Sequence, residues 1–305
     1  MTTALITHPA CLDHQLPRHP ERPERLQAIL EDVDKTGLIR ELNQVTAREA
    51  SNQLLARTHP REFIEFIQGL SPSSGTASVD PDTYMSPGSL RAARLAAGAC
   101  IQATEMVLAK EVDNAFCAVR PPGHHTELSE AMGFCLFNNI AVAVQTALQD
   151  KRINRVAIVD FDVHHCNGTV DIFKQREEVL VCSSFQYPFY PNRYLDYRNA
   201  HIITSPLRAG SGTDEFRMAV EKGWLPAIEA HKPDMIFISA GFDAHTDDLM
   251  GELNLTEEDY LWVTRLIKKL ANSHSEGRIV SSLEGGYDLQ ALAASTHVHL
   301  EGLME

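Results

Sequence analysis

The sequence has no long apolar run, no closely spaced cysteine pair and no secretory signal. No stretch approaches the roughly 18 consecutive apolar residues of a membrane span, so we expect no membrane contact. The first residues lack a basic end followed by an apolar core, so we predict no signal peptide and a cytoplasmic protein. Six cysteines without a CxxC pair are typical of buried free thiols in a reducing compartment.

Positive charge is also scarce. The chain has 27 basic and 41 acidic residues, which gives a formal net charge of −14. Such a surface repels the phosphate backbone of nucleic acids. We therefore expect no direct nucleic-acid binding.

The 305 residues contain no internal repeat, low-complexity tract or linker, so we predict a single domain over residues 1–305. The most polar stretch, residues 71–89, is rich in Pro, Gly and Ser. This composition predicts a long loop rather than a domain boundary.

Apolar runs alternate with helical patterns along most of the remaining chain. Strands buried on both faces are predicted at residues 115–119, 155–161, 179–184, 234–240 and 278–283. Helices are predicted at residues 90–110, 138–150, 213–230 and 256–272, the last opening with a capping-box pattern at Thr256 and Asp259. This alternation implies an α/β fold with a mainly parallel sheet covered on both faces.

Four of the predicted strands are followed by clusters of polar residues. The clusters are RPPGHH (120–125), DFDVHH (160–165), GFDAH (241–245) and EGGY (284–287). In open α/β sheets, ligands bind beyond the carboxyl ends of the strands. We therefore expect these four clusters to build one site.

The second and third clusters supply a candidate metal site. Residues two apart in an extended chain point the same way, so Asp160, Asp162 and His164 share one side. Asp243 follows another strand and adds a second carboxylate. Asp162, His164 and Asp243 leave a fourth position open for water, as catalytic Zn²⁺ requires, and the oxygen-rich set also suits Fe²⁺.

Two alternatives stay open at this point. His245 stands two residues after Asp243 and competes with it as the third ligand. Asp247 and Asp248 are also close in sequence, and a second metal of the arginase type would need such extra carboxylates.

The first and fourth clusters supply candidate catalytic groups. After the Pro-Pro-Gly turn, one of His124 and His125 can act as general base on a water molecule. Asp160 and Asn167 are the expected partners that orient the two imidazoles. Gly285 and Gly286 permit the tight turn that aims Tyr287, whose hydroxyl can donate to a developing oxyanion.

These motifs resemble the signature blocks of the histone-deacetylase and acetylpolyamine-amidohydrolase family. The blocks span nearly the whole chain and are HPERPERL (19–26), RPPGHH (120–125), GFCLFNN (133–139), VDFDVHHCNGT (159–169), ISAGFDAH (238–245) and EGGY (284–287). Asn167 is similar to the class II branch of that family. The resemblance implies an arginase/deacetylase-like three-layer α/β/α fold with a central, mainly parallel eight-stranded sheet. It also implies one zinc at the base of a narrow tunnel.

The resemblance also implies roles for single residues. Asp162, His164 and Asp243 match the zinc ligands, and His124 and His125 match the tandem histidines, with His125 as the general base. Tyr287 matches the tyrosine that polarises the amide carbonyl. The family's tunnel positions match Arg25 at the floor, Gly133 and Phe134 on one wall, and Gly285 beside the tyrosine. The aspartate at the rim of the tunnel matches Asp82 in preference to Asp80. A structural potassium ion is implied beside Asp160, Asp162, His164, Ser183 and Ser184.

Four features depart from the family pattern. Cys166 replaces a glycine, and Phe185 replaces a histidine. The turn YPNRY (190–194) replaces a YPGTG-type turn, and Met250 stands where polyamine-specific relatives carry an acidic residue. We expect the first three to affect the tunnel wall and Met250 to disfavour a polyamine.

The resemblance predicts zinc-dependent hydrolysis of N-acyl amides, with acyl-lysine side chains of peptides or proteins as the first candidate substrate. An acetylpolyamine or another small acylated amine is the alternative. An arginase-like ureohydrolase and a non-catalytic acyl-lysine binder are the remaining hypotheses. The sequence does not indicate which oligomeric state the protein adopts.

Overall fold

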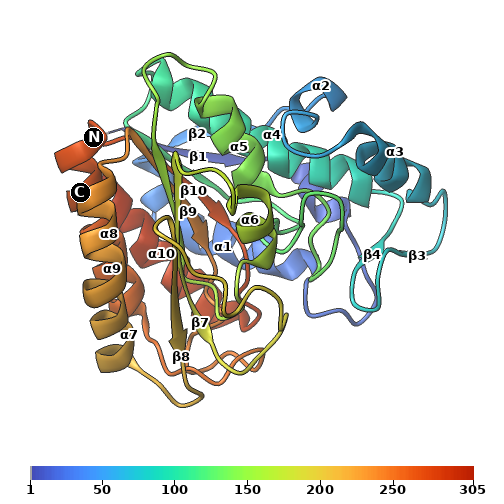
Figure 1. The fold of residues 1–305 in the computed structure, drawn as a ribbon. Helices are drawn as coiled ribbons and strands as arrows, with labels where there is room; N and C mark the ends of the chain where they lie inside the picture. The colour runs from blue at the N-terminus through green and yellow to red at the C-terminus, as the bar shows by residue number, and fades with distance from the viewer. Residues whose placement is uncertain (1) are drawn as a thin grey trace.

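A computed structural model describes residues 2–305 (Figure 1). Its central element is an eight-stranded sheet, as the sequence predicted. The strands are β1 (Thr3–Thr7), β2 (Asn43–Thr46), β5 (Asn114–Cys117), β6 (Val156–Asp160), β7 (Val179–Gln186), β8 (Ile202–Leu207), β9 (Met235–Ala240) and β10 (Ile279–Leu283).

The strands lie in the order β2-β1-β5-β10-β9-β6-β7-β8, and every neighbouring pair is parallel. Every residue of β5, β6, β7, β9 and β10 is buried. This burial explains why their sequences lack alternation between polar and apolar residues. Because all the strands are parallel, their carboxyl ends lie at one edge of the sheet.

Helices cover both faces and complete the three-layer α/β/α arrangement. They are α1 (Pro23–Lys35), α2 (Asn52–Leu55), α3 (Arg61–Leu70), α4 (Ser89–Leu108), α5 (Asn139–Ala147), α6 (Asn167–Phe173), α7 (Thr213–Ala219), α8 (Leu225–His231), α9 (Glu257–His274) and α10 (Leu289–Met304). Shorter turns are η1 (Pro9–Asp13), η2 (Leu38–Arg40) and the π-helical η3 (Val220–Trp224). Helices α4 and α5 pack together on one face, whereas α1, α9 and α10 pack together on the other.

The predicted helices and strands correspond closely to these elements, with two differences. The predicted loop at residues 71–89 contains a short antiparallel hairpin, β3 (Ala77–Ser78) and β4 (Tyr84–Met85). The segment 213–230, predicted as one helix, is divided into α7 and α8 by the π-helical turn η3. The capping box of α9 is present, because the backbone N–H of Thr256 donates to Asp259 at 3.1 Å.

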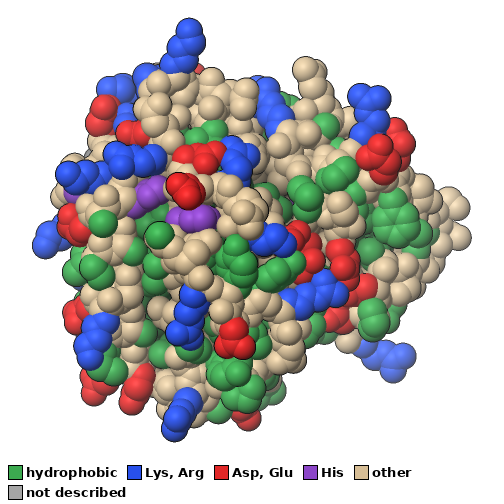
Figure 2. All heavy atoms as spheres, in the orientation of Figure 1, with side chains coloured by type: hydrophobic (Ala, Val, Ile, Leu, Met, Phe, Trp, Pro, Cys, Tyr) green, Lys and Arg blue, Asp and Glu red, His purple; other side chains and the backbone are tan. Residues whose placement is uncertain are grey.

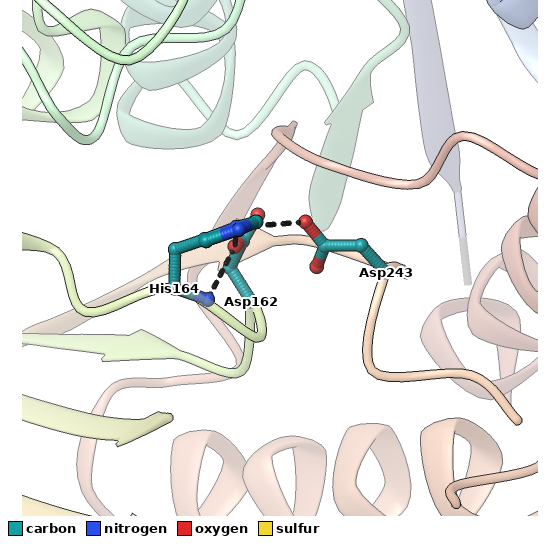
Figure 3. A group of neighbouring side chains, drawn as sticks. All are labelled: Asp162, His164 and Asp243. Atoms are coloured by element: carbon teal, nitrogen blue, oxygen red, sulfur yellow. Dashed lines mark hydrogen bonds and ion pairs between the residues drawn. The ribbon is translucent and has the colours of Figure 1, made fainter. Parts of the chain in front are cut away.

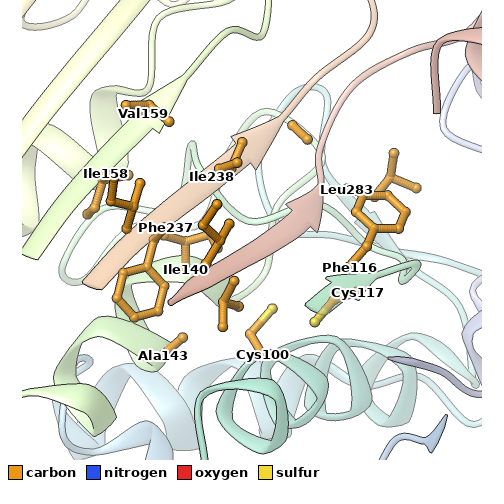
Figure 4. Close-up of a cluster of buried hydrophobic side chains, with 14 of the residues drawn as sticks. Cys100, Phe116, Cys117, Ile140, Ala143, Ile158, Val159, Phe237, Ile238 and Leu283 are labelled. Atoms are coloured by element: carbon orange, nitrogen blue, oxygen red, sulfur yellow. The ribbon is translucent and has the colours of Figure 1, made fainter. Parts of the chain in front are cut away.

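The apolar core lies between the sheet and its helices. Figure 4 shows Cys100 of α4 and Ala143 of α5 directed at the strands that carry Phe116, Cys117 and Phe237. All six cysteines are buried and unbridged, as the sequence predicted.

On the face that Figure 2 shows, acidic and basic side chains are interspersed. Within the part of the chain that the structure describes, no helix is both long and apolar enough to cross a membrane.

Candidate active site

The four polar clusters meet because their strands are neighbours in the sheet. The strands β5, β10, β9 and β6 are adjacent in that order, although they are far apart in the sequence. His124 and His125 follow β5, and Glu284 follows β10. Asp243 follows β9, and Asp162 follows β6. One edge of the sheet therefore carries all four.

Asp162, His164 and Asp243 form a buried group whose candidate ligand atoms lie within 4.8 Å of one another (Figure 3). The Nδ1 atom of His164 is 3.1 Å from Asp162 Oδ1 and 3.1 Å from Asp243 Oδ2. Ligand atoms held about 2 Å from one zinc ion lie about 3 to 4 Å apart. The three side chains therefore fit one common cation.

Backbone groups and glycines hold these carboxylates in place. The N–H of Val163 donates to Asp243 Oδ1 at 2.9 Å, and the N–H of Gly285 donates to Asp162 Oδ2 at 2.8 Å. A Cβ atom on Gly285 would collide with both carboxylates, which explains why only glycine fits there. Asp243 Oδ2 is buried and accepts no hydrogen bond. An oxygen left without a donor in this position suits a metal ligand.

The charges of this group favour a bound cation. Burial and the charge of Asp162 raise the pKa of Asp243 to about 7. Burial alone would lower the pKa of His164, but the neighbouring carboxylates of Asp162 and Asp243 outweigh burial and raise the pKa to about 10. The two carboxylates thus demand a positive charge between them, and a divalent cation would provide it.

The alternative ligands considered from the sequence lie elsewhere. His245 accepts a hydrogen bond from the N–H of Asp247, and its Nε2 atom faces Glu257 at 3.5 Å. Asp247 is largely exposed, and Asp248 accepts from the N–H of Tyr287 and from the next residue. Within residues 2–305, Asp162, His164 and Asp243 are the one group of three or more candidate ligands that lies close enough for a metal.

His124 and His125 lie beside this group with ring centroids 4.0 Å apart. His124 Nδ1 is 3.0 Å from Asp160 Oδ2, and His125 Nδ1 is 2.7 Å from Asn167 Oδ1. Because an amide oxygen only accepts, His125 Nδ1 carries the proton, and its Nε2 is left as an acceptor. Both histidines thus have the partners that the sequence predicted.

The two histidines have opposite electrostatic surroundings. Burial disfavours charge on His124, but the carboxylates of Asp162 and Asp160 outweigh it and raise the pKa to about 10. Burial and the positive charges of His124 and His164 lower the pKa of His125 well below its usual value. At neutral pH, His124 is therefore charged and His125 is neutral.

Glu284 is a site residue that the sequence reasoning missed. Its buried Oε2 accepts from the N–H of Gly123 at 2.6 Å and from the N–H of His124 at 3.1 Å. The carboxylate thus holds the backbone turn that presents the tandem histidines. A signal was available, because Glu284 opens the EGGY cluster directly after a predicted central strand, where ligand-binding residues gather.

Tyr287 is positioned by the glycine turn and by Arg25. Gly286 has a φ of +118°, which an L side chain rarely adopts, and this turn directs Tyr287 toward the site. Arg25 donates to the backbone oxygens of Gly286 and Glu284, and its guanidinium lies 4.6 Å from the centre of the Tyr287 ring. Burial raises the pKa of Tyr287 well above its usual value, so the hydroxyl keeps its proton.

Three of these groups, His125, His164 and Tyr287, face a cavity of about 420 Å³. It is lined by Asp82, His125, Gly133, Phe134, His164, Phe189, Tyr190, Leu249, Met250 and Tyr287. The sequence left one wall unassigned, and the structure forms it from Phe189, stacked on His164, and Tyr190, whose ring edge meets His125. The aromatic walls leave a mainly apolar channel.

The opposite wall and the rim come from the loop after β5 and from the turn between β3 and β4. Gly133 has a φ of +58°, and a Cβ atom there would collide with the ring of His125. Asp82 lines the cavity and accepts from the N–H of Gly133 at 3.1 Å. Asp80 instead accepts from the N–H groups of Asp82 and Thr83 and closes the turn below.

Two of the four departures lie outside the cavity. Cys166 is buried with a φ of −74°, so a thiol side chain is accommodated without left-handed backbone. Phe185 is buried against His165, with ring centroids 4.2 Å apart. The turn at 190–194 contributes only Tyr190 to the cavity, because Arg193 pairs with Glu130 and Glu127 outside it. Met250 lines the rim.

Comparisons with known proteins place the chain in one family. The sequence model described as Histone deacetylase domain matches residues 19–303. The histone deacetylase-like amidohydrolase of Pseudomonas aeruginosa is 38% identical over 276 residues, which are 88% of this chain and 72% of that protein. Polyamine deacetylase HDAC10 of Homo sapiens is 33% identical over 303 residues, which are 93% of this chain and 44% of that protein. The crystal structure of the HDA15 HD domain has a TM-score of 0.93 at 34% identity and covers 99% of this chain and 88% of that one.

Proposed function

The chain belongs to the histone deacetylase family of amidohydrolases, and from this premise we propose that it hydrolyses the side-chain amide of acyl-lysine in peptides or proteins. One observation carries the proposal. A cavity of about 420 Å³ with aromatic walls is lined by His164, His125 and Tyr287. An extended acyl-lysine side chain suits such a channel, with its amide at the floor.

We assign the metal site to Asp162, His164 and Asp243 and the cation to Zn²⁺, with Fe²⁺ as the alternative that suits the same oxygen-rich donors. A cation bound there would supply Lewis acidity, polarising the acyl carbonyl and lowering the pKa of a water molecule. The potassium ion expected beside Asp160, Asp162, His164, Ser183 and Ser184 stays a prediction, as does a single domain over residues 1–305.

Side chains of the protein transfer the protons and stabilise the developing charge. Neutral His125 accepts a proton from the attacking water at Nε2, while Asn167 holds its Nδ1–H. The Tyr287 hydroxyl donates to the oxygen of the acyl group as negative charge develops there. Protonated His125 then delivers its proton to the departing lysine amine. Charged His124, held by Asp160, stabilises the negative charge of the reacting centre.

Substrate roles follow from the lining of the cavity. Gly133 and Phe134 form one wall and Phe189 the other, while Asp82 stands at the rim to accept from backbone amides of a peptide. Gly285 leaves room for the two metal-binding carboxylates, and Arg25 sets the position of Tyr287 from beneath.

The alternatives make different demands on the same site. An acylated polyamine has no backbone amide for Asp82 and would meet apolar Met250 rather than an acidic group at the rim. A ureohydrolase of the arginase type needs a second metal, whereas the candidate ligands form one group. A non-catalytic binder would not need the opposed pKa values of His124 and His125.

The test is a hydrolysis panel with metal analysis of the same sample. We expect acetyl-lysine peptides to be turned over faster than acetylputrescine or acetylspermidine, with about one zinc per chain. Faster turnover of the acetylpolyamines would reject acyl-lysine as the substrate. Two manganese ions per chain would favour the ureohydrolase, and peptide binding without turnover in metal-replete protein would favour the binder.

A further inference from the structure

A second and larger cavity borders the tunnel. Its volume is about 950 Å³, and it is formed by the loop at residues 15–20, the start of α1 and Tyr287. Tyr287 lines both cavities, so this second cavity, here named the mouth cavity, shares a wall with the tunnel. The reaction proposed for the tunnel does not use the residues of the loop at 15–20.

The charged residues of the mouth cavity are mostly basic. Arg18, Arg22 and Glu24 line it together with His19. Arg18, Arg22 and Glu24 are all exposed, and they place two positive charges against one negative charge. This balance is the reverse of that of the whole chain, whose formal charge is −14.

Neither arginine is neutralised within residues 2–305. Glu21, which lies between them in sequence, is buried and paired with His14, Arg25 and Arg120 instead. Neither Arg18 nor Arg22 takes part in a salt bridge, which leaves both guanidinium groups available to a ligand. Arginine presents its donors in a planar fork that matches a carboxylate.

The loop that carries the arginines is fixed to the tunnel wall. The ring of His19 meets Phe134 edge-on, with centroids 4.5 Å apart, and its Nε2 donates to the backbone oxygen of Asp82 at 3.3 Å. The N–H of Glu21 donates to His19 Nδ1 at 3.1 Å. Arg18 and Arg22 are therefore each next to an anchored residue, and a site held in this way loses less entropy on binding.

The rim carboxylate on the tunnel wall has its protein donors at Oδ1, while Oδ2 is left to accept from backbone amides of a peptide. Asp82 accepts from the N–H of Gly133 and from the hydroxyl of Thr83. The opening thus presents a carboxylate with protein partners on one wall and two unpaired guanidinium groups in the mouth cavity. This asymmetry favours a substrate that carries negative charge close to its acyl-lysine.

We propose that the mouth cavity binds a carboxylate adjacent to the acyl-lysine, so that the substrate is an acyl-lysine with an acidic neighbour. This inference rests on the proposed deacetylation and adds the specificity of that site. The mouth cavity borders the tunnel through Tyr287 and through His19, which contacts Phe134, so the carboxylate is assigned to a position one or two residues from the lysine, where an extended chain spans about 3.5 Å per residue. The carboxylate comes either from an Asp or Glu side chain or from the α-carboxylate of a terminal acyl-lysine.

The test compares matched acetyl-lysine peptides whose neighbouring residue is Glu, Gln or Lys. A second pair ends in acetyl-lysine with either a free or an amidated carboxyl group and so separates the two sources. For the metal-replete protein we expect Glu to raise kcat/KM about fivefold over Gln, mainly through KM, in keeping with exposed ion pairs. At about 0.5 M salt the advantage should shrink, because exposed charges are screened.

The variant R18Q/R22Q should lower the Glu-to-Gln ratio to about one. The matched control is Arg40→Gln, which changes an exposed arginine beyond the far end of α1 and should keep the wild-type ratio. A ratio near one in the wild type, or a ratio that R18Q/R22Q leaves unchanged, would overturn the proposal. Preference for the Lys peptide would overturn it as well.

Dissociation constants of the same peptides separate this inference from the proposed function. Arginine-dependent tighter binding of the Glu peptide without turnover supports the mouth cavity and rejects the hydrolysis. Equal dissociation constants for the Glu and Gln peptides, with turnover of both at one rate, reject the mouth cavity and support the hydrolysis.

Discussion

His124 and His125 are adjacent in sequence, yet their surroundings drive their pKa values in opposite directions. Asp160 and Asp162 surround His124, whereas His125 is bonded to a neutral amide and lies near other positive charges. Two identical side chains therefore acquire different protonation states from their neighbours alone. This division allows one histidine to accept a proton while the other keeps its charge.

Replacement of Tyr287 by Phe should remove one donor to the developing oxyanion. We expect turnover to fall about 10² to 10³-fold with the metal content unchanged. The measurement is kcat on an acetyl-lysine peptide with metal analysis of the same preparation. Tyr197→Phe is the matched control, because that hydroxyl donates to Lys174 O outside the tunnel. Turnover of the Tyr287 variant close to that of wild type would reject the assigned role.

Glu284 offers a test of positioning. In Glu284→Gln the amide oxygen can still accept from the N–H groups of Gly123 and His124, whereas in Glu284→Leu both donors lose their partner. We expect the Gln variant to stay near the wild-type kcat and the Leu variant to lose about 10²-fold, because small displacements of catalytic groups are costly. KM should change little in either variant. If the Gln variant were as slow as the Leu variant, the charge rather than the hydrogen bonds would be responsible.

At the scale of elements, one buried histidine ring forms hydrogen bonds with two other segments of the chain. His59, between α2 and α3, has its Nδ1 3.1 Å from Leu128 O, and its Nε2 accepts from the N–H of Asn138 at 3.0 Å. Asn138 is the N-cap of α5. This arrangement requires a neutral ring, because a second ring proton would face the N–H of Asn138.

The neutral ring makes stability depend on pH. Burial lowers the pKa of His59 to about 4, below the value of about 6.5 in the unfolded chain. The unfolded state then binds more protons between these values, so this stabilisation is complete above pH 6.5 and is lost as the pH falls toward 4. From pH 7 to 5 we expect His59 to contribute a loss of about 2 kcal/mol in the free energy of unfolding.

Urea denaturation of wild type and His59→Gln at both pH values measures this contribution. The wild type should lose more stability than the variant between pH 7 and 5. Equal losses would mean that His59 is charged, or not buried, in the folded protein.

The sequence predicts some elements well for a clear physical reason. The five strands with every residue buried have mainly apolar sequences and were located within a few residues. The missed strands include β2 and β8, which are the edges of the sheet and have exposed or half-buried positions. The sequence of an edge strand resembles that of a loop because one side of the strand lacks a partner. Pro206 in β8 adds to this resemblance.

From the strand pattern alone, the site was predictable only where residues follow central strands. Asp162, His164, Asp243 and the histidine pair could be grouped because parallel strands end at one edge. The ion pair of Glu21 with Arg120 joins segments about a hundred residues apart and leaves no local pattern, although Glu21 also pairs with Arg25 four positions away. The wall of Phe189 and Tyr190 depends on an irregular loop, whose course no periodicity encodes.

At the scale of the whole molecule, the candidate metal site joins β6 to β9. A cation there binds the folded state alone, because Asp162 and Asp243 are 81 positions apart in the unfolded chain. We expect removal of metal by a chelator to abolish hydrolysis and lower the Tm, and Zn²⁺ at about 1,000 times its Kd to restore about 4 kcal/mol. Calorimetry and activity on one sample measure both. Unchanged activity in metal-free protein would reject metal dependence.

The position of β10 has a consequence for biosynthesis. It is the last strand to be made, yet it lies between β5 and β9 in the middle of the sheet. A nascent chain that has not yet released residue 283 from the ribosome lacks the strand that joins its two halves, together with Glu284 and Tyr287. Until β10 is available, β5 and β9 lack the neighbour that they share, so the sheet and the active centre can be completed only when this late strand is inserted between them.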